Sequence, residues 1–202
     1  MKKKTFEKEL PESYQEIYVV DATTKKFTIV MNLAALLITL IITISGTIII
    51  RPSLREIFDT PFLTIRMLVF TVILFAYIVL HELVHGLFYK ILTKQKLKFG
   101  FSVTVAFCGV PDIYVYRSTA MVALLAPFII FLPVFIIPAI FCPFAIDKFL
   151  AVFMLASHVG GCTGDLYDTF LYCFKFKNPM TLMQDTGPKQ TFYIPAKTDE
   201  TL

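Results

Sequence analysis

The chain has 202 residues, of which 56% are apolar and 17% charged, and its formal net charge is +4. Together with a mean hydropathy of +0.71, this composition excludes an ordinary soluble globular domain and predicts a membrane protein. The lysines flank the apolar runs, which fits membrane orientation and a lipid bilayer as partner, and argues against nucleic acid.

Four apolar runs are long enough to cross a bilayer, for which about 20 residues suffice. The fold class that they predict is an all-α membrane protein with about four transmembrane helices, near residues 27–50, 62–92, 119–146 and 149–174. The third run contains several prolines, which should kink or locally break its helix.

Three parts are expected along the chain. Residues 1–26 form an N-terminal segment, residues 27–176 form the transmembrane domain, and residues 177–202 look like a flexible tail. Lys and Arg are abundant in the N-terminal segment and in the second loop, but sparse in the first and third loops. The positive-inside rule therefore predicts a multi-pass cell-membrane protein with both termini and the second loop in the cytoplasm.

The second loop contains two β-rich runs, Phe99 to Phe107 and Ile113 to Tyr116, separated by a turn-like stretch at 109–112. This pattern predicts a small cytoplasmic β-hairpin. An edge strand of the hairpin could bind an unwound substrate segment by strand addition. If cleavage were unchanged after Val103 and Val105 were replaced by Pro, this hypothesis would be wrong.

The second run contains the sequence HELVH at residues 81–85. On a helix, His81 and His85 project from one face and can bind one metal ion, as in the HExxH zinc signature. Zinc held by two imidazoles and one further protein ligand activates a water molecule and polarises a scissile carbonyl. Glu82 would then act as the general base and pass the proton to the leaving amine.

A chance match is less favoured here than in a soluble protein. Ionisable residues within a membrane span cost a few kcal/mol each, and they are seldom retained without a partner or a task. Three such residues stand within five positions of this span. We therefore favour a metal site over a purely structural polar cluster or a site that has lost its metal.

The candidates for a third ligand lie in the fourth run, because the only glutamate after Glu82 is Glu200 in the tail. At about 1.5 Å of rise per residue, Asp165 lies roughly 24 Å from the outer end of its span, level with the histidines at roughly 21 and 27 Å. Asp168 lies one turn deeper, which suits a supporting or alternate-ligand role. His158 lies two turns from Asp165, too far for both to bind one ion unless the helix breaks.

Two glycines of the fourth run, Gly160 and Gly164, have GxxxG spacing and permit close helix packing. Packing of the fourth span on the second would bring Asp165 within reach of the metal. The predicted site thus comprises Glu82 as catalytic residue and His81, His85 and Asp165 as metal ligands.

With HELVH on one span and Gly164-Asp165 on a later one, the chain resembles the site-2 protease group of intramembrane zinc metallopeptidases. It resembles more closely a zincin peptidase family of short multi-pass membrane proteins. The resemblance covers about residues 75–175, with HELVHG, the lysine-rich hairpin loop, ALLAP at 123–127 and GCTGDLYD at 161–168. It implies a zincin-type fold and a bound metal. For a peptidase of this kind, the expected substrate is a membrane protein or peptide.

Other functions stay open at this point. The chain could be a non-catalytic membrane protein with a structural or transport-related metal site, or an accessory subunit with a decayed site. Two histidines and a carboxylate also suit iron, cobalt or manganese, so Zn²⁺ is an inference from the pattern. Replacing Glu82 by Gln would separate a peptidase, which should keep zinc but lose turnover, from a metal-binding protein.

Overall fold

The computed structural model describes residues 4–101 and 106–196. The chain divides into two compact units. The first, the sheet unit, comprises Met1–Thr28, Glu82–Ala126 and Asp165–Leu202, and the second, the helical unit, comprises Ile29–His81 and Pro127–Gly164.

Three helices are long and apolar enough to cross a membrane: α1 (Lys25–Ile50), α3 (Leu63–Thr93) and α4 (Arg117–Phe141). A fourth span is formed if α5 (Ala145–Gly161) is counted with the helical stretch Thr163–Lys175, to which it is joined at a 42° bend. The chain is therefore a mostly helical membrane protein with three or four candidate spans.

Sequence features set the limits of these helices. The charge-free run of α1 ends at Arg51-Pro52, and the short helix α2 (Leu54–Phe58) begins after Ser53, which forms a capping box with Glu56. Helix α4 stays a single helix although it contains Pro127, Pro133 and Pro138. The predicted break in the third span is therefore not observed, and the real break occurs in the fourth span, at Cys162.

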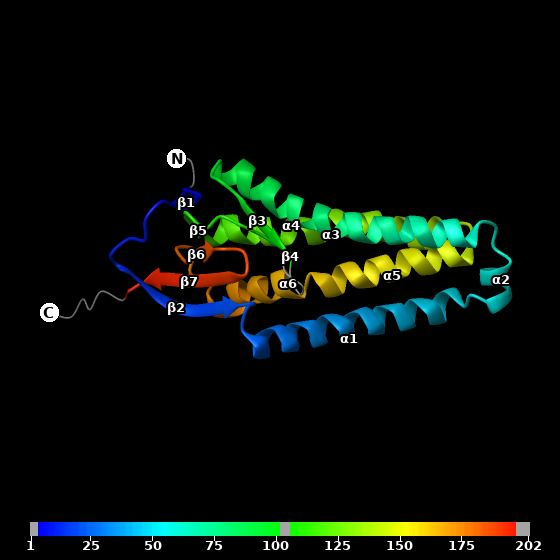
Figure 1. Ribbon diagram of the computed structural model, residues 1–202. Coiled ribbons are helices and arrows are strands. Elements are labelled where there is room, and N and C mark those ends of the chain that lie inside the picture. The colour runs from blue at the N-terminus through cyan, green and yellow to red at the C-terminus, as the bar shows by residue number, and fades with distance from the viewer. Residues whose placement is uncertain (1–3, 102–105, 197–202) are drawn as a thin grey trace. The chain divides into compact units, whose positions relative to one another are not determined.

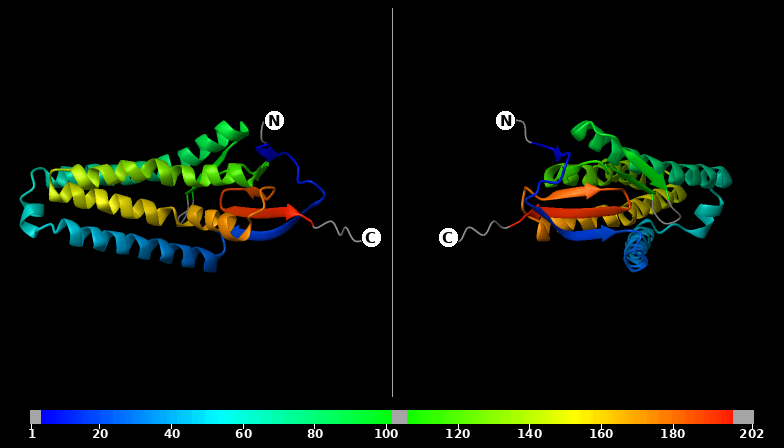
Figure 2. Two further views of the ribbon diagram at one scale, coloured as in Figure 1. Left: turned by 180° about the vertical axis from the view of Figure 1, so that it is seen from behind. Right: turned by 60° about the vertical axis from the view of Figure 1, so that its left-hand side comes forward.

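The sheet unit contains a five-stranded antiparallel sheet in the order β1-β5-β6-β7-β2 (Figure 1). The all-α prediction is wrong in this respect. The longest pairing joins β2 to β7, which lie side by side in the views of Figure 2. The bounds of the five strands are β1 Phe6–Glu7, β2 Tyr14–Asp21, β5 Tyr114–Tyr116, β6 Leu182–Asp185 and β7 Lys189–Pro195.

Residues 177–202 were expected to be a flexible tail, yet they supply two of these strands. Leu182, Met183 and Phe192 are fully buried in the hydrophobic core of the sheet unit. The hydrophobic effect on such side chains is about 1.5–3 kcal/mol each, enough to order a short hairpin. Composition alone misled here because several polar residues of this segment lie within its strands, where Asp185 and Thr191 are buried.

A separate two-stranded hairpin follows α3, as predicted, but with different strands. Strand β3 (Lys98–Phe101) pairs with β4 (Ala106–Gly109), and both strands come from the first of the two β-rich runs. The second run forms β5, which pairs with β1 and β6 in the five-stranded sheet. Val103 and Val105 lie outside the described residues.

The helical unit is held together by a close approach between α1 and α5. A Cβ atom at Gly160 would lie 2.6 Å from the carbonyl oxygen of Ala35 and 2.3 Å from Oγ1 of Thr39. The Thr39 hydroxyl donates a hydrogen bond to the carbonyl of Ala156 at 3.3 Å. The partner of Gly160 is thus α1, not the second span as expected, and a Cβ at Gly164 would meet nothing within 4 Å.

The same unit contains an ion pair between Arg66 of α3 and Asp147 of α5. The guanidinium of Arg66 also lies 4.5 Å from the ring centroid of Phe144. An unpaired charge in an apolar span would be costly, so this pairing accounts for the arginine within the second span.

Candidate metal centre

Helix α3 carries His81, Glu82 and His85. Residues four apart project from the same face of a helix, so the two imidazoles are neighbours along one face, and Glu82 is rotated by about 100° from His81. Both histidines are buried, with 8% and 6% of their surfaces exposed, and Glu82 is half-buried. Two buried imidazoles on an otherwise apolar helix need polar partners.

His85 has a backbone carbonyl of α4 as its partner, and a proline one turn later leaves that carbonyl free to accept. Its Nδ1 atom lies 2.9 Å from the carbonyl oxygen of Ala123. In a regular helix this carbonyl would accept the N–H of residue 127, but Pro127 has none. The carbonyl can therefore accept a hydrogen bond from Nδ1–H of His85, which leaves the lone pair of the neutral ring on Nε2.

The Nε2 atom of His85 lies 3.4 Å from Oδ1 of Asp165, which is in the first turn of α6 (Thr163–Phe170). This distance is longer than an ordinary N–H···O hydrogen bond of about 2.7–3.2 Å. When Nε2 carries a proton the two side chains form an ion pair, and when it does not, the two lone pairs face one another and a metal cation can take the place of the proton. Donors about 2.0–2.2 Å from a tetrahedral zinc ion would themselves be about 3.3–3.5 Å apart, so this pair fits zinc.

The hairpin β3–β4 packs against α3 next to the two sequence-predicted residues of the sheet unit, Glu82 and His85. A Cβ atom at Gly86 would lie 2.6 Å from Cζ of Phe99 and 3.2 Å from Sγ of Cys108. A larger residue here would displace the ring of Phe99. The glycine that follows HELVH thus gives the hairpin room to lie close to the helix.

Cys108 of β4 is the cysteine that Gly86 approaches. Burial and the negative charges of Asp185 and Glu82 raise the pKa of its thiol to about 12. A neutral buried thiol is a poor nucleophile. The chemistry of the site is therefore not that of a cysteine peptidase built on Cys108.

The two alternate ligands are placed differently from Asp165. Asp168 is buried, and its Oδ1 has no hydrogen-bond partner among the described residues. His158 is fully buried in the helical unit, where Tyr77 and the carbonyl of Phe128 are its hydrogen-bond partners. The contact between His85 and Asp165 involves neither of them.

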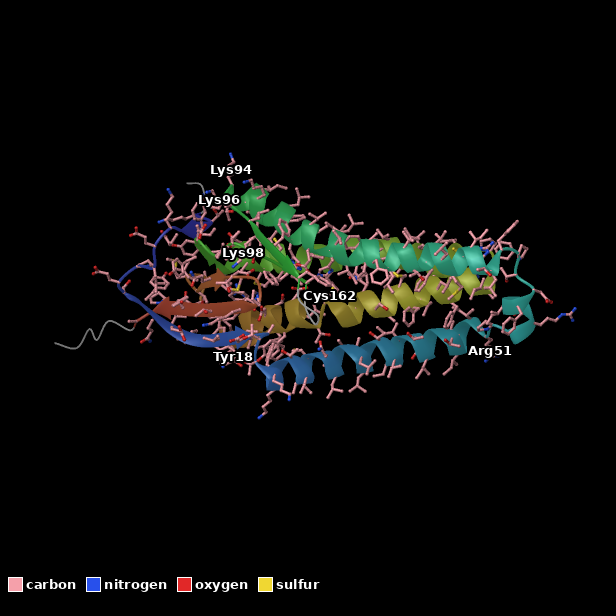
Figure 3. The ribbon with its side chains drawn as sticks, viewed as in Figure 1. Tyr18, Arg51, Lys94, Lys96, Lys98 and Cys162 are labelled. Carbon is pink, nitrogen blue, oxygen red and sulfur yellow. The ribbon has the colours of Figure 1, made fainter. Side chains whose placement is uncertain are left out.

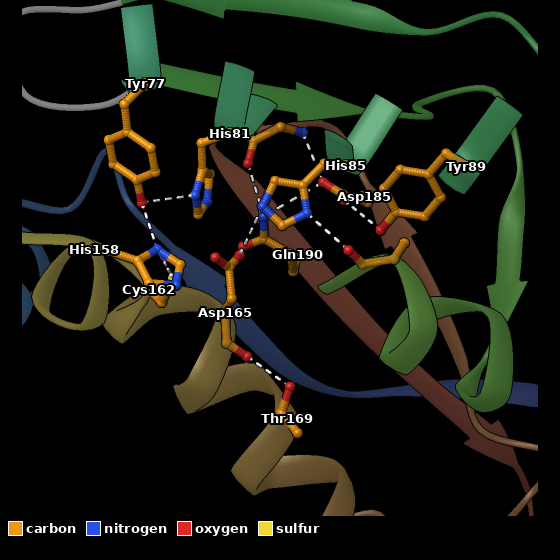
Figure 4. A network of polar contacts seen from close by, with 12 residues as sticks. Tyr77, His81, His85, Tyr89, His158, Cys162, Asp165, Thr169, Asp185 and Gln190 are labelled. Atoms are coloured by element: carbon orange, nitrogen blue, oxygen red, sulfur yellow. Dashed lines mark hydrogen bonds and ion pairs between the residues drawn. The ribbon is translucent and has the colours of Figure 1, made fainter. Parts of the chain in front are cut away.

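Asp185 is a polar residue near His85 that the sequence did not identify. It ends β6, accepts a hydrogen bond of 2.8 Å from the hydroxyl of Tyr89, and accepts another of 2.9 Å from the N–H of Gly187 (Figure 4). Tyr89 lies one helical turn after His85 on α3. The available signal was the Asp-Thr-Gly order, which is typical of a turn closed by an aspartate side chain.

Tyr77 is the second residue that the sequence reading missed. Its hydroxyl lies 3.2 Å from Nδ1 of His81 and 2.7 Å from Nδ1 of His158, as the dashed lines in Figure 4 show. Its position four residues before His81 was the available signal, since this spacing places both residues on one helix face.

Comparison with known proteins gives one match. The model of a family described as "Putative zincin peptidase" matches residues 74–180, just over half of the chain. The matched region includes His81, Glu82, His85 and Asp165. No curated protein and no solved structure matches the chain significantly.

Proposed function

Because the chain belongs to this family of zincin peptidases, we propose that it is a zinc-dependent, membrane-embedded metallopeptidase. Its substrates are membrane or membrane-associated proteins, cut near the cytoplasmic leaflet. Family membership supports the assignment as a zinc metallopeptidase. The three or four apolar helices support the location in a membrane. The residue assignment rests on the 3.4 Å separation between His85 Nε2 and Asp165 Oδ1.

His81, His85 and Asp165 are the proposed zinc ligands. The two histidines are one turn apart on an uninterrupted helix, and His85 is paired with the carboxylate. Zinc bound there would activate a water molecule and polarise the scissile carbonyl. Asp168, which is buried and lies about one turn after Asp165 on α6, is not among these proposed ligands.

Glu82 is the proposed general base. Its carboxylate would take the proton from the attacking water and then deliver it to the leaving amine. A half-buried position suits this role, because the carboxylate keeps access to water while the adjacent burial strengthens its electrostatic effect. The hydrogen bond from His85 to Ala123 keeps that imidazole from rotating during the reaction.

Strand β3 is the proposed substrate-binding edge. In the described residues it pairs with β4 on one side only, and Phe99 and Phe101 are exposed. An extended substrate could pair with the other edge of β3. A side chain at Gly100 would meet the ring of Phe107, so the test is made at the exposed Phe101: Phe101→Asp should lower cleavage while zinc content is unchanged.

The orientation is proposed from charge. Lys94 and Lys96, in the segment that joins α3 to β3, and Lys98, the first residue of β3, are exposed (Figure 3). A cluster of lysines next to a span favours the cytoplasmic side. The orientation can be tested by labelling intact cells with a cysteine reagent, using single cysteines placed at Lys96 and near Arg51. Labelling at Lys96 would contradict the proposed orientation.

Glu82→Gln tests the proposed function. The purified full-length variant should keep one zinc ion per chain and lose about 100- to 10,000-fold in cleavage of a library of quenched fluorescent peptides and transmembrane segments. Glu16→Gln, on an exposed position of β2, is the matched control and should leave both unchanged. If Glu82→Gln cleaved as fast as the unmodified protein, the protein would be a metal-binding protein and not a peptidase of this type.

A further inference from the structure

The helical unit contains a chain of polar contacts that begins at His81 and ends at a backbone carbonyl. The Tyr77 hydroxyl lies 3.2 Å from Nδ1 of His81 and 2.7 Å from Nδ1 of His158. Nε2 of His158 lies 3.1 Å from the carbonyl oxygen of Phe128. All three side chains are buried, and Figure 4 shows the Tyr77 hydroxyl joined by dashed lines to both imidazoles.

The direction of each hydrogen bond follows from the carbonyl. A carbonyl oxygen only accepts, so Nε2 of His158 carries a proton, and Nδ1 of the neutral ring is an acceptor. The Tyr77 hydroxyl therefore donates to Nδ1 of His158. Because that uses the single hydroxyl proton, the phenol oxygen accepts from Nδ1–H of His81.

The consequence for His81 is a defined tautomer. With its proton on Nδ1, the neutral ring has its lone pair on Nε2. The ring nitrogen that binds a metal is commonly fixed in this way by the hydrogen bond of the other nitrogen. His85 has the same arrangement, with Ala123 as the acceptor of its Nδ1–H.

Aromatic rings surround this chain of contacts. Phe131 and Phe135 lie edge-on to Tyr77, with centroids 5.2 and 5.3 Å away, and Phe128 stacks on His158 at 5.7 Å. In such an apolar environment each hydrogen bond is stronger than in solvent. If the Tyr77 hydroxyl were removed, water could not easily replace it.

Cys162 offers a competing interpretation. His81, His158 and Cys162 have ligand atoms within 4.8 Å of one another, and Sγ of Cys162 lies 3.6 Å from Nδ1 of His158. These three residues could form a metal site of their own. However, the Tyr77 hydroxyl at 2.7 Å already occupies the Nδ1 lone pair that the metal would need, so the hydrogen-bonded chain explains the geometry better.

We propose that Tyr77 and His158 are positioning residues that hold His81 in its Nδ1–H tautomer, so that Nε2 of His81 is the zinc-binding nitrogen. The proposal rests on the proposed zinc site. It gives His158 a role other than that of a ligand, and it assigns a function to Tyr77.

Zinc affinity of the purified full-length protein, measured by competition with a chromophoric chelator, tests the proposal. Tyr77→Phe keeps the ring and removes only the hydroxyl, and we expect it to weaken zinc binding about 10- to 100-fold. Tyr18→Phe removes a hydroxyl that is bonded to Tyr167 at 2.9 Å and should leave the affinity unchanged. Cys162→Ser should also leave it unchanged.

A second readout reports the tautomer directly. In zinc-free protein with ¹⁵N-labelled histidine, the ring nitrogen shifts of His81 should indicate Nδ1–H, and Tyr77→Phe should shift them toward a mixture of tautomers. Equal zinc affinity and equal shifts in Tyr77→Phe and the unmodified protein would overturn the proposal. A Cys162→Ser variant that loses zinc as strongly as Tyr77→Phe would replace it with the cysteine-containing site.

The zinc measurements also distinguish failure of the proposed zinc site from failure of the positioning role. If the unmodified protein bound no zinc at micromolar concentrations, the zinc site itself would be wrong. If it bound zinc and only the Tyr77→Phe effect were missing, the zinc site would stand and the positioning role would be rejected.

Discussion

The Nε2 atom of His85 and the Oδ1 atom of Asp165 lie 3.4 Å apart, although the two residues come from α3 and α6. With Nδ1–H of His85 directed at the carbonyl of Ala123, the neutral ring turns the lone pair of Nε2 toward the carboxylate. A cation between them removes the repulsion. The separation matches two donors of a tetrahedral zinc ion, about 3.3–3.5 Å apart.

Asp165→Asn should therefore remove zinc from the purified protein. The amide is neutral and a weak ligand, so the metal would lose one of its three protein donors. Metal analysis by mass spectrometry should give well below one zinc per chain. Asp168→Asn is the matched control, because Asp168 lies one turn further along α6 and should retain full zinc; the reverse pattern would make Asp168 the third ligand.

Pro127→Ala tests the acceptor of His85. Alanine restores an N–H that can donate to the carbonyl of Ala123 and compete with Nδ1–H of His85. The loss of a hydrogen bond worth about 1 kcal/mol corresponds to roughly fivefold weaker zinc binding. Pro133→Ala, on the same helix, affects the carbonyl of Ile129 and should leave the affinity unchanged. Equal affinities in the two variants would contradict this role of Pro127.

The membrane spans and the histidine pair could be predicted because both depend on local sequence. Hydropathy marks a span within about 20 residues, and the spacing of His81 and His85 fixes their shared face within one turn. The break at Cys162 had no comparable signal. The prolines of α4 suggested a break that is not there, because neighbouring helices can satisfy the carbonyls freed by Pro127 and Pro133.

The five-stranded sheet could not be predicted because its pairing is non-local. Its strands come from the N-terminal segment, the second loop and the C-terminal segment; β1, β5 and β6 are too short to show a clear alternation, and the longer β2 and β7 pair with each other from opposite ends of the chain. The contacts of Asp185 with Tyr89 and of Tyr77 with His158 depend on the same long-range folding. The position of Tyr77, four residues before His81, and the Asp-Thr-Gly order at Asp185 were visible in the sequence, but the long-range partners were not.

Gly160→Ala should destabilise the protein. The new methyl group would lie 2.6 Å from the carbonyl oxygen of Ala35 and 2.3 Å from Oγ1 of Thr39, so α1 and α5 would have to separate. Overpacking of this kind costs about 1–3 kcal/mol. Thermal unfolding in detergent should show a lower midpoint. Gly161→Ala is the control, since nothing lies within 4 Å of its added Cβ; a similar loss in both variants would indicate a general intolerance of this turn.

Asp185, which lies outside the spans, should make the free energy of unfolding depend on pH. Burial raises the pKa of its carboxyl group from 3.8 to about 6, against the lowering effect of the hydrogen bonds from Tyr89 and Gly187. A raised pKa means that the folded protein prefers the neutral acid. Its stabilising contribution is therefore complete below pH 3.8 and is lost as the pH rises through 6. The difference of about 2 pH units corresponds to about 3 kcal/mol.

Asp185→Asn should remove this contribution, so that the free energy of unfolding of the zinc-free protein falls less between pH 4 and pH 7 than in the unmodified protein. Glu7→Gln provides a comparison of opposite sign. Burial raises the pKa of Glu7, but hydrogen bonds from Lys4 and Tyr116 outweigh it and lower the pKa overall. The stabilisation from Glu7 is thus present above its unfolded pKa and lost as the pH falls. Parallel changes in both variants would show that neither carboxylate governs the pH dependence.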